Sequence, residues 1–211
     1  MSPAVPIYYG VTGAEISLAP ETSVTLPELR ETVEMVGRGS MWAVDKQRML
    51  GAQVNGSGRI RTYAWFLGPA DWVLPADLAE ARRALLEGYE GWALALRKLI
   101  EHCDSVAMYL RPLYHLPTDH RWEHVNGFVL LGDMAHLMSP FAGAGANLAM
   151  LDTLELGIVI ADVVSSGKST EEREAAAIVE WEEARMSDGR AGASRSRTWT
   201  GHSPWKVHLL T

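Results

Sequence analysis

Apolar and polar residues alternate along the first third of the chain, which is the pattern of half-buried β-strands. This period of two predicts strands over residues 6–18, 41–44, 49–54 and 60–66. Turn residues at 45–46 and 55–58 separate the last three of these segments at hairpin spacing. A short helix is predicted over 26–35. The pattern therefore predicts an antiparallel meander that follows a helix.

Between residues 76 and 103 the apolar positions recur at helical spacing instead, and two glycines interrupt them. Because Gly88 and Gly91 weaken a helix, the segment predicts two helices or one bent helix. A further strand is predicted over 106–113, where it would return to the sheet.

The pattern changes again at Gly127, after which four apolar residues follow without a polar interruption. Such a continuous run over 128–131 predicts a strand that is covered on both faces, as in a parallel sheet. A helix is predicted from Asn147 to Gly167, and a capping box at 169–172 predicts the start of another. Residues 187–211 have no clear period, and we assign them no element.

Between the predicted strand and helix lies a turn, Gly132-Asp133, followed by a loop of small residues. The loop would let a flat ligand approach the backbone, and the first N–H groups of the helix would attract a polar or anionic edge. Asp133 would accept hydrogen bonds from hydroxyl groups of such a ligand. Each piece alone has an ordinary structural explanation, because a Gly-Asp pair often ends a strand and glycines ease packing.

Aromatic residues suggest a second candidate surface. On the predicted meander, alternate side chains point to one face, and the chain is rich in tryptophan, with eight in all. These side chains form either the wall of a cavity for a bulky ring-containing ligand or the core under the sheet. The candidates are Trp42, Gln53, Tyr63 and Trp65.

Composition excludes several classes of function. The formal net charge of −7 argues against binding to nucleic acid or to an anionic membrane surface. A single cysteine excludes an internal disulfide, and the histidines show no metal-ligand spacing, so we predict no metal site. No signal peptide or membrane span is recognisable, which predicts a cytoplasmic protein.

The stretch GDMAHLMSPFAGAGANLAMLD, from Gly132 to Asp152, resembles the second flavin-binding motif of the aromatic-hydroxylase class of FAD-dependent monooxygenases. Within that class it is similar to tetracycline-inactivating enzymes and to fungal enzymes of secondary metabolism. The resemblance implies FAD as cofactor, a substrate domain before the motif, and Phe141 facing the substrate. The implied cofactor-binding residues are Gly132, Asp133, Pro140, Gly143, Ala144, Gly145, Ala146 and Asn147.

Another motif of that class, the G-x-G-x-x-G turn that binds the ADP half of FAD, is missing from these 211 residues. We therefore expect an α+β fold with two parts. Residues 1–125 would form an antiparallel substrate-domain sheet with helices, and residues 126–211 an incomplete remnant of the α/β flavin domain. The amino-terminal FAD-binding half would be absent, as in a truncated, split or fragmentary member.

Three functions stay open on this basis. One is a flavin-dependent monooxygenase acting on a bulky ring-containing small molecule, and another is a cofactor-independent cyclase or isomerase that reuses the cavity. The third is a non-catalytic binding or regulatory remnant of such an enzyme. FAD affinity would be lost if the missing turn were essential. No catalytic side chain is identified, because the cofactor would carry the redox chemistry. A homodimer or a separate chain is expected to cover the apolar run at 128–131.

Overall fold

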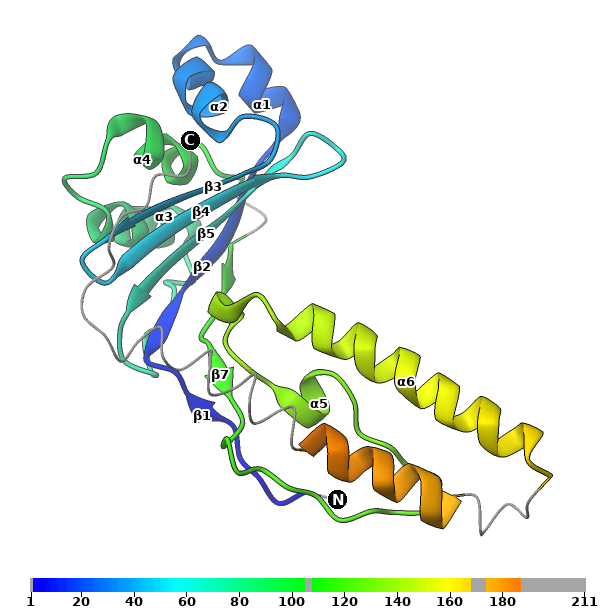
Figure 1. The fold of residues 1–211 in the computed structure, drawn as a ribbon. Coiled ribbons are helices and arrows are strands. Elements are labelled where there is room, and N and C mark those ends of the chain that lie inside the picture. Colours follow the sequence, from blue (N-terminus) through cyan, green and yellow to red (C-terminus); the bar gives the residue numbers. More distant parts are fainter. Residues whose placement is uncertain (1, 105–107, 168–173, 187–211) are drawn as a thin grey trace. The chain divides into compact units, whose positions relative to one another are not determined.

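A computed structural model describes residues 2–104, 108–167 and 174–186. The chain divides into two compact units. In the described residues, the first unit consists of residues 2–9 together with the segments from Tyr114 onward, and the second of residues 10–113. The predicted α+β class is confirmed, with helices and antiparallel sheets mixed in one chain (Figure 1). The predicted division into 1–125 and 126–211 stays a prediction.

The second unit is built on an antiparallel five-stranded sheet with strand order β3-β4-β5-β2-β6. The predicted meander is confirmed, since β3 pairs with β4 and β4 with β5. The sheet then continues with β2 against β5, in register from Val11 opposite Leu67 to Leu18 opposite Ile60. The strands are β2 (Val11–Leu18), β3 (Ser40–Asp45), β4 (Arg48–Val54), β5 (Ile60–Leu67) and β6 (Tyr109–Leu110).

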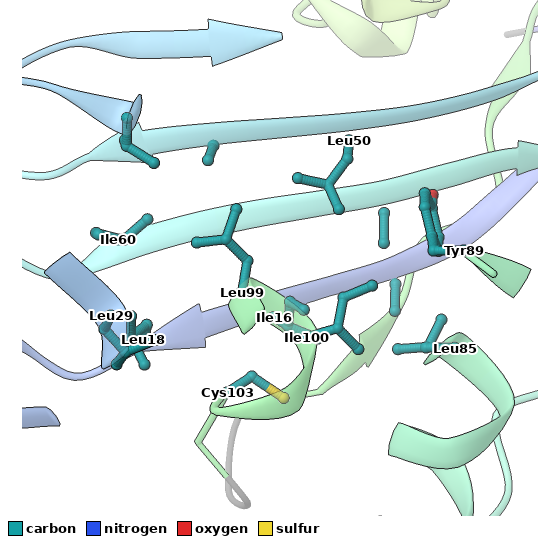
Figure 2. Packing of buried hydrophobic residues seen from close by; sticks show 14 residues of the cluster. Ile16, Leu18, Leu29, Leu50, Ile60, Leu85, Tyr89, Leu99, Ile100 and Cys103 are labelled. Atoms are coloured by element: carbon teal, nitrogen blue, oxygen red, sulfur yellow. The ribbon is translucent and has the colours of Figure 1, made fainter. Parts of the chain in front are cut away.

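Helices cover one face of this sheet, and the apolar core lies between them and the strands (Figure 2). The predicted break at Gly88 and Gly91 is confirmed, because two helices form there rather than one. The first, α3, begins at the N-cap Asp77, whose carboxylate accepts the Glu80 N–H. The helices are α1 (Pro20–Thr25), η1 (Pro27–Leu29), α2 (Arg30–Val36), α3 (Leu78–Gly88) and α4 (Leu94–Glu101).

Strand alternation explains which side chains form the core. Ile16, Leu50 and Ala64 point to the covered face and are fully buried against Leu85, Leu99 and other helical residues (Figure 2). Tyr89 is buried among them, and its hydroxyl donates to the carbonyls of Met49 and Trp65 at 2.9 and 3.1 Å. The sequence pattern therefore encodes a sheet with one face committed to packing.

The first unit contains a two-stranded antiparallel sheet and several helical segments. Its short strands β1 and β7 pair Ile7 with His115 and Tyr8 with Tyr114. The elements are β1 (Ile7–Tyr8), β7 (Tyr114–His115), α5 (Asp133–His136), η2 (Pro140–Ala142), α6 (Gly145–Ser165) and η3 (Glu174–Ile178), which continues as helix over 179–186.

Several predictions for these segments need correction. Residues 128–131 do not form a strand among the described residues: Phe128 makes an isolated bridge with Val125, and its side chain is 59% exposed. An apolar run becomes a strand only when a neighbour satisfies its backbone, and the described residues supply no such neighbour. The predicted strand over 106–113 is reduced to β6 in the described residues, and α6 begins at Gly145, two residues before Asn147.

The predicted capping box at 169–172 lies outside the described part of the chain, as does the unassigned segment 187–211. Within residues 2–104, 108–167 and 174–186, no helix has the combination of length and apolar character that a membrane span requires.

Candidate functional site

The turn at Gly132-Asp133 lies in the first unit, where it begins the short helix α5. Gly132 has φ +59° and ψ −138°, a conformation that side-chain-bearing residues rarely adopt. Its carbonyl accepts the N–H groups of Ala135 and His136 at 3.0 and 2.8 Å. The turn leaves Asp133 exposed, so its carboxylate is accessible to a ligand.

The small-residue loop follows within the same unit. Pro140 begins the single turn η2, and Gly143 closes it in the left-handed conformation with φ +61°, donating its N–H to the Pro140 carbonyl at 2.9 Å. Apart from Gly143 and its two chain neighbours, the described residues place no atom within 4 Å of the position that a Cβ on Gly143 would occupy. The loop thus presents bare backbone with open space beside it.

Helix α6 starts directly from this loop. Its N-cap is Ala144, and no side chain caps the first turn or places an acidic group there. The N–H groups of the first turn, at Gly145, Ala146 and Asn147, carry the positive end of a 21-residue helix. This end of α6 suits a hydrogen-bond acceptor or an anionic group.

Helix α6 also connects the loop to the Gly132-Asp133 turn. A Cβ on Gly132 would lie 3.4 Å from the Cβ of Ala149, and the Gly132 N–H donates to Asp152 at 3.1 Å. Since a helix rises 1.5 Å per residue, the turn packs roughly 6–10 Å along α6 from Gly145. The unit therefore has a glycine loop at the start of α6 and an acidic turn about one to two helical turns further along, a spacing that suits an extended ligand.

Beneath this surface lies a group of buried polar side chains that the sequence reasoning missed. Asp152 is fully buried, and its carboxylate lies 3.2 Å from Nε2 of buried His136, although the imidazole is not aligned for an ideal hydrogen bond. Burial lowers the pKa of His136, with nearby Arg185 and His120 acting in the same direction and Asp152 opposing them. The signal in the sequence was an aspartate within an apolar helix.

A second buried carboxylate ties the segment 179–186 to the residues before the turn. Glu182 accepts the indole N–H of Trp122 at 3.0 Å and lies 2.8 Å from Nδ1 of His124. Arg185 pairs with Glu155 of α6 at 3.1 Å. These pairs join three segments of the first unit, namely the residues before the turn, helix α6 and the segment 179–186.

The predicted cavity residues divide between the two units. In the second unit, strand pairing places Trp42, Tyr63 and Trp65 on the face of the sheet opposite the helices, and Gln53 shares that face. The indole of Trp42 lies across Gly51, where a Cβ would come within 2.2 Å of the ring. Tyr63 and Trp65 stack at 5.0 Å between ring centroids.

This face lies opposite the apolar core cluster, and its role as a ligand wall stays a prediction. Glu15 also lies on it, 3.2 Å from Arg61 and 2.8 Å from Arg111. Phe141 belongs to the first unit, where its ring lies 5.8 Å from that of Tyr9. Among the described residues, no group of three or more metal-ligating side chains comes together.

The segment that contains the turn and the loop is similar to known proteins. Residues 120–180 match the family model of the FAD binding domain. Monooxygenase penA of Penicillium thymicola is 31% identical over 134 residues, covering 59% of this chain and 31% of that protein. Salicylate hydroxylase of Pseudomonas putida is 36% identical over 98 residues, covering 44% of this chain and 20% of that protein.

The fold is similar to that of solved flavoprotein structures. HpxO of Klebsiella pneumoniae, in complex with FAD and uric acid, superposes with a TM-score of 0.71 at 22% identity, covering 92% of this chain and 45% of that one. The chain thus spans about half of this structure and a third or less of the curated relatives. The chain is similar to FAD-dependent monooxygenases of the aromatic-hydroxylase class, and it corresponds to part of the full-length proteins.

Proposed function

We propose that this chain carries the flavin-ring side of the active site of an FAD-dependent monooxygenase that acts on a bulky, ring-containing small molecule. The observation that supports this most is the open glycine loop at the uncapped start of α6, within the segment that matches the FAD binding domain. When bound and reduced by an external two-electron donor, FAD would supply the redox chemistry that transfers one oxygen atom from O₂ to the substrate, while the second oxygen atom leaves as water.

The residues present fit such a cofactor. A flat ring requires backbone without side chains, and Gly143 has open space where a side chain would stand. Oxygen acceptors on the ligand would meet the N–H groups of Gly145, Ala146 and Asn147, while Asp133 would accept from its hydroxyl groups. Pro140 and Ala144 would form the remaining wall of the loop. In all of these roles the protein binds and orients the cofactor, and none of them requires a proton transfer.

For the substrate we propose the helix-free face of the second unit, with Trp42, Gln53, Tyr63 and Trp65 as its wall. Aromatic rings provide large apolar contact area at a small cost in conformational entropy, and Gln53 adds a polar group that fixes orientation. Support for a ring-containing substrate comes from the relative salicylate hydroxylase of Pseudomonas putida, whose name refers to an aromatic compound. The wall would exclude water from the reacting ring.

Titration with FAD tests the cofactor proposal directly. Asp133→Ala should weaken FAD affinity by about 1–3 kcal/mol, because the carboxylate that accepts hydrogen bonds from the ligand is lost. Gly143→Val should abolish binding, since a branched side chain would occupy the open space at a left-handed residue. Flavin fluorescence and absorbance would report both affinities.

Two matched variants control for indirect effects. Asp162→Ala removes an exposed aspartate from helix α6, and Gly91→Val introduces a branched residue at another open glycine with positive φ. Both should bind FAD as the parent does. If the parent fails to bind FAD yet still converts a ring-containing compound, the cofactor-independent cyclase or isomerase becomes the better proposal.

We also propose that a partner covers the exposed apolar side chains of the first unit, with a second copy of the chain ranked before a separate polypeptide. Support comes from α6, where Met150, Leu154, Ile158 and Val164 are each more than half exposed, and from Phe128. Light scattering of the purified protein should show a dimer. A monomer that binds no hydrophobic dye would contradict this proposal.

A further inference from the structure

We infer that Asp152 is a positioning residue that fixes the Gly132-Asp133 turn from beneath, and that ligand affinity depends on its acceptor oxygen. This inference rests on the proposed function of the turn as part of a flavin site. Asp152 does not itself reach the exposed surface, because its side chain is 0% exposed. Its action must therefore pass through the groups that it contacts.

The contacts of Asp152 define what it holds. Its Oδ2 atom accepts the N–H of Gly132 at 3.1 Å, and the same oxygen lies 3.2 Å from Nε2 of His136. The backbone N–H of His136 in turn donates to the carbonyl of Gly132 at 2.8 Å. Gly132 is thus fixed at both its N–H and its carbonyl, and one residue, His136, takes part on both sides.

This arrangement gives a reason for an aspartate at a buried position of an apolar helix. Burying a carboxylate is costly unless hydrogen-bond donors compensate it, and a surface position on α6 would avoid the cost altogether. The donor that compensates it is the N–H of Gly132, whose φ of +59° directs the next residue, Asp133, outward. Loss of the acceptor would leave that N–H without a partner and would free the turn to change direction.

Two substitutions of similar volume separate positioning from packing. Asp152→Asn keeps an oxygen that can accept the Gly132 N–H, whereas Asp152→Leu fills the same space without an acceptor. We expect FAD affinity to fall by at least about tenfold in Asp152→Leu, which corresponds to about 1.4 kcal/mol, and to stay within about threefold of the parent in Asp152→Asn. Should the leucine variant fold poorly, Asp152→Ala would replace it.

Met186→Ala provides the control for general instability. Met186 is a buried residue of the small apolar cluster around Trp122. The acceptor of the Gly132 N–H is Asp152, so truncation of Met186 leaves that hydrogen bond in place. Positioning predicts that this variant unfolds more easily but binds FAD normally. If affinity instead follows thermal stability across the whole set of variants, or if Asp152→Leu binds as the parent does, the inference is wrong.

Amide hydrogen exchange without any ligand distinguishes this inference from the proposed function. The Gly132 amide should exchange at least about tenfold faster in Asp152→Leu than in the parent, and Asp152→Asn should restore its protection. If the variants show this pattern of exchange but the parent binds no FAD, the proposed function is contradicted and the positioning role is left intact. An unchanged Gly132 amide in the leucine variant would overturn the positioning role whatever the protein binds.

Discussion

The two units of this chain are stabilised in different ways. The second unit has a five-stranded sheet with an apolar core in which Ile16, Leu50 and Leu99 are fully buried. The first unit buries a small apolar cluster around Trp122 and relies on buried polar pairs, while much of α6 stays exposed. Apolar burial stabilises a fold more dependably than buried ion pairs do. The contrast indicates that apolar burial stabilises mainly the second unit, whereas specific polar contacts contribute more to the first.

Removal of core volume should have the largest effect, and it should act on the second unit. Leu99→Ala deletes a fully buried side chain between α4 and the sheet and should cost about 2–5 kcal/mol. Hydrogen exchange of the β4 and β5 amides, measured at increasing urea concentration, would give the change in the free energy of unfolding. A cost below about 1 kcal/mol would mean that this core is looser than its burial indicates.

A smaller loss is expected when only a buried hydroxyl is removed. Tyr89→Phe deletes the group that donates to the carbonyls of Met49 and Trp65, and it should cost about 1–2 kcal/mol. Denaturant midpoints of the variant and the parent would show the difference. Tyr63→Phe, on the helix-free face, serves as the control and should leave stability nearly unchanged.

Acidification should weaken the first unit selectively. His136 has a pKa below its ordinary value of about 6.5 because it is buried, so the unfolded chain binds the proton more readily than the folded one. Stability should therefore fall as the pH drops from about 6.5 toward the folded-state pKa, and it should be regained above this range. The groups facing the imidazole are Asp152, Arg185 and His120.

Protection of the Gly132 amide measured as a function of pH would report this loss. His136→Asn should flatten the dependence, because asparagine does not titrate, and sheet amides of the second unit should not follow it. A first unit whose stability rises on acidification would show that the pair with Asp152 outweighs the effect of burial.

The smallest effect should be a gain. Gly157 lies in the middle of α6, and no neighbouring atom lies within 4 Å of the position that a Cβ would occupy there, so Gly157→Ala should stabilise the helix by about 0.5–1 kcal/mol. The same change at Gly51 should be harmful, since its Cβ would meet the Trp42 ring. Thermal unfolding should show a higher midpoint than the parent for Gly157→Ala in α6 and a lower midpoint for Gly51→Ala in the sheet.

The sequence predicted those elements well that depend on interactions between neighbouring residues, and it predicted less well those that depend on pairing between distant segments. The meander and the two-helix segment were predicted because turn residues at 55–58 and the glycines Gly88 and Gly91 act on their immediate neighbours. The strand at 128–131 was predicted wrongly, because strand formation depends on a paired neighbour that lies elsewhere. Local signals are sufficient for hairpins and helices, and they are insufficient for a parallel sheet.

The same distinction applies to the candidate site. The turn and loop from Gly132 to Asn147 were identified as a motif, and the structure places them along one helix, although their role in binding stays a prediction. Asp152 was missed, since its burial depends on a turn twenty residues earlier and on His136. Its importance emerges only from contacts that no spacing rule describes.

Hydrogen exchange with and without FAD tests the central claim most directly, because it locates the cofactor in one unit or the other. We expect added FAD to slow exchange at Gly132, Asp133 and the first turn of α6, while amides of β4 and β5 in the second unit stay unchanged. Protection confined to the sheet, or no protection anywhere at saturating FAD, would contradict the account.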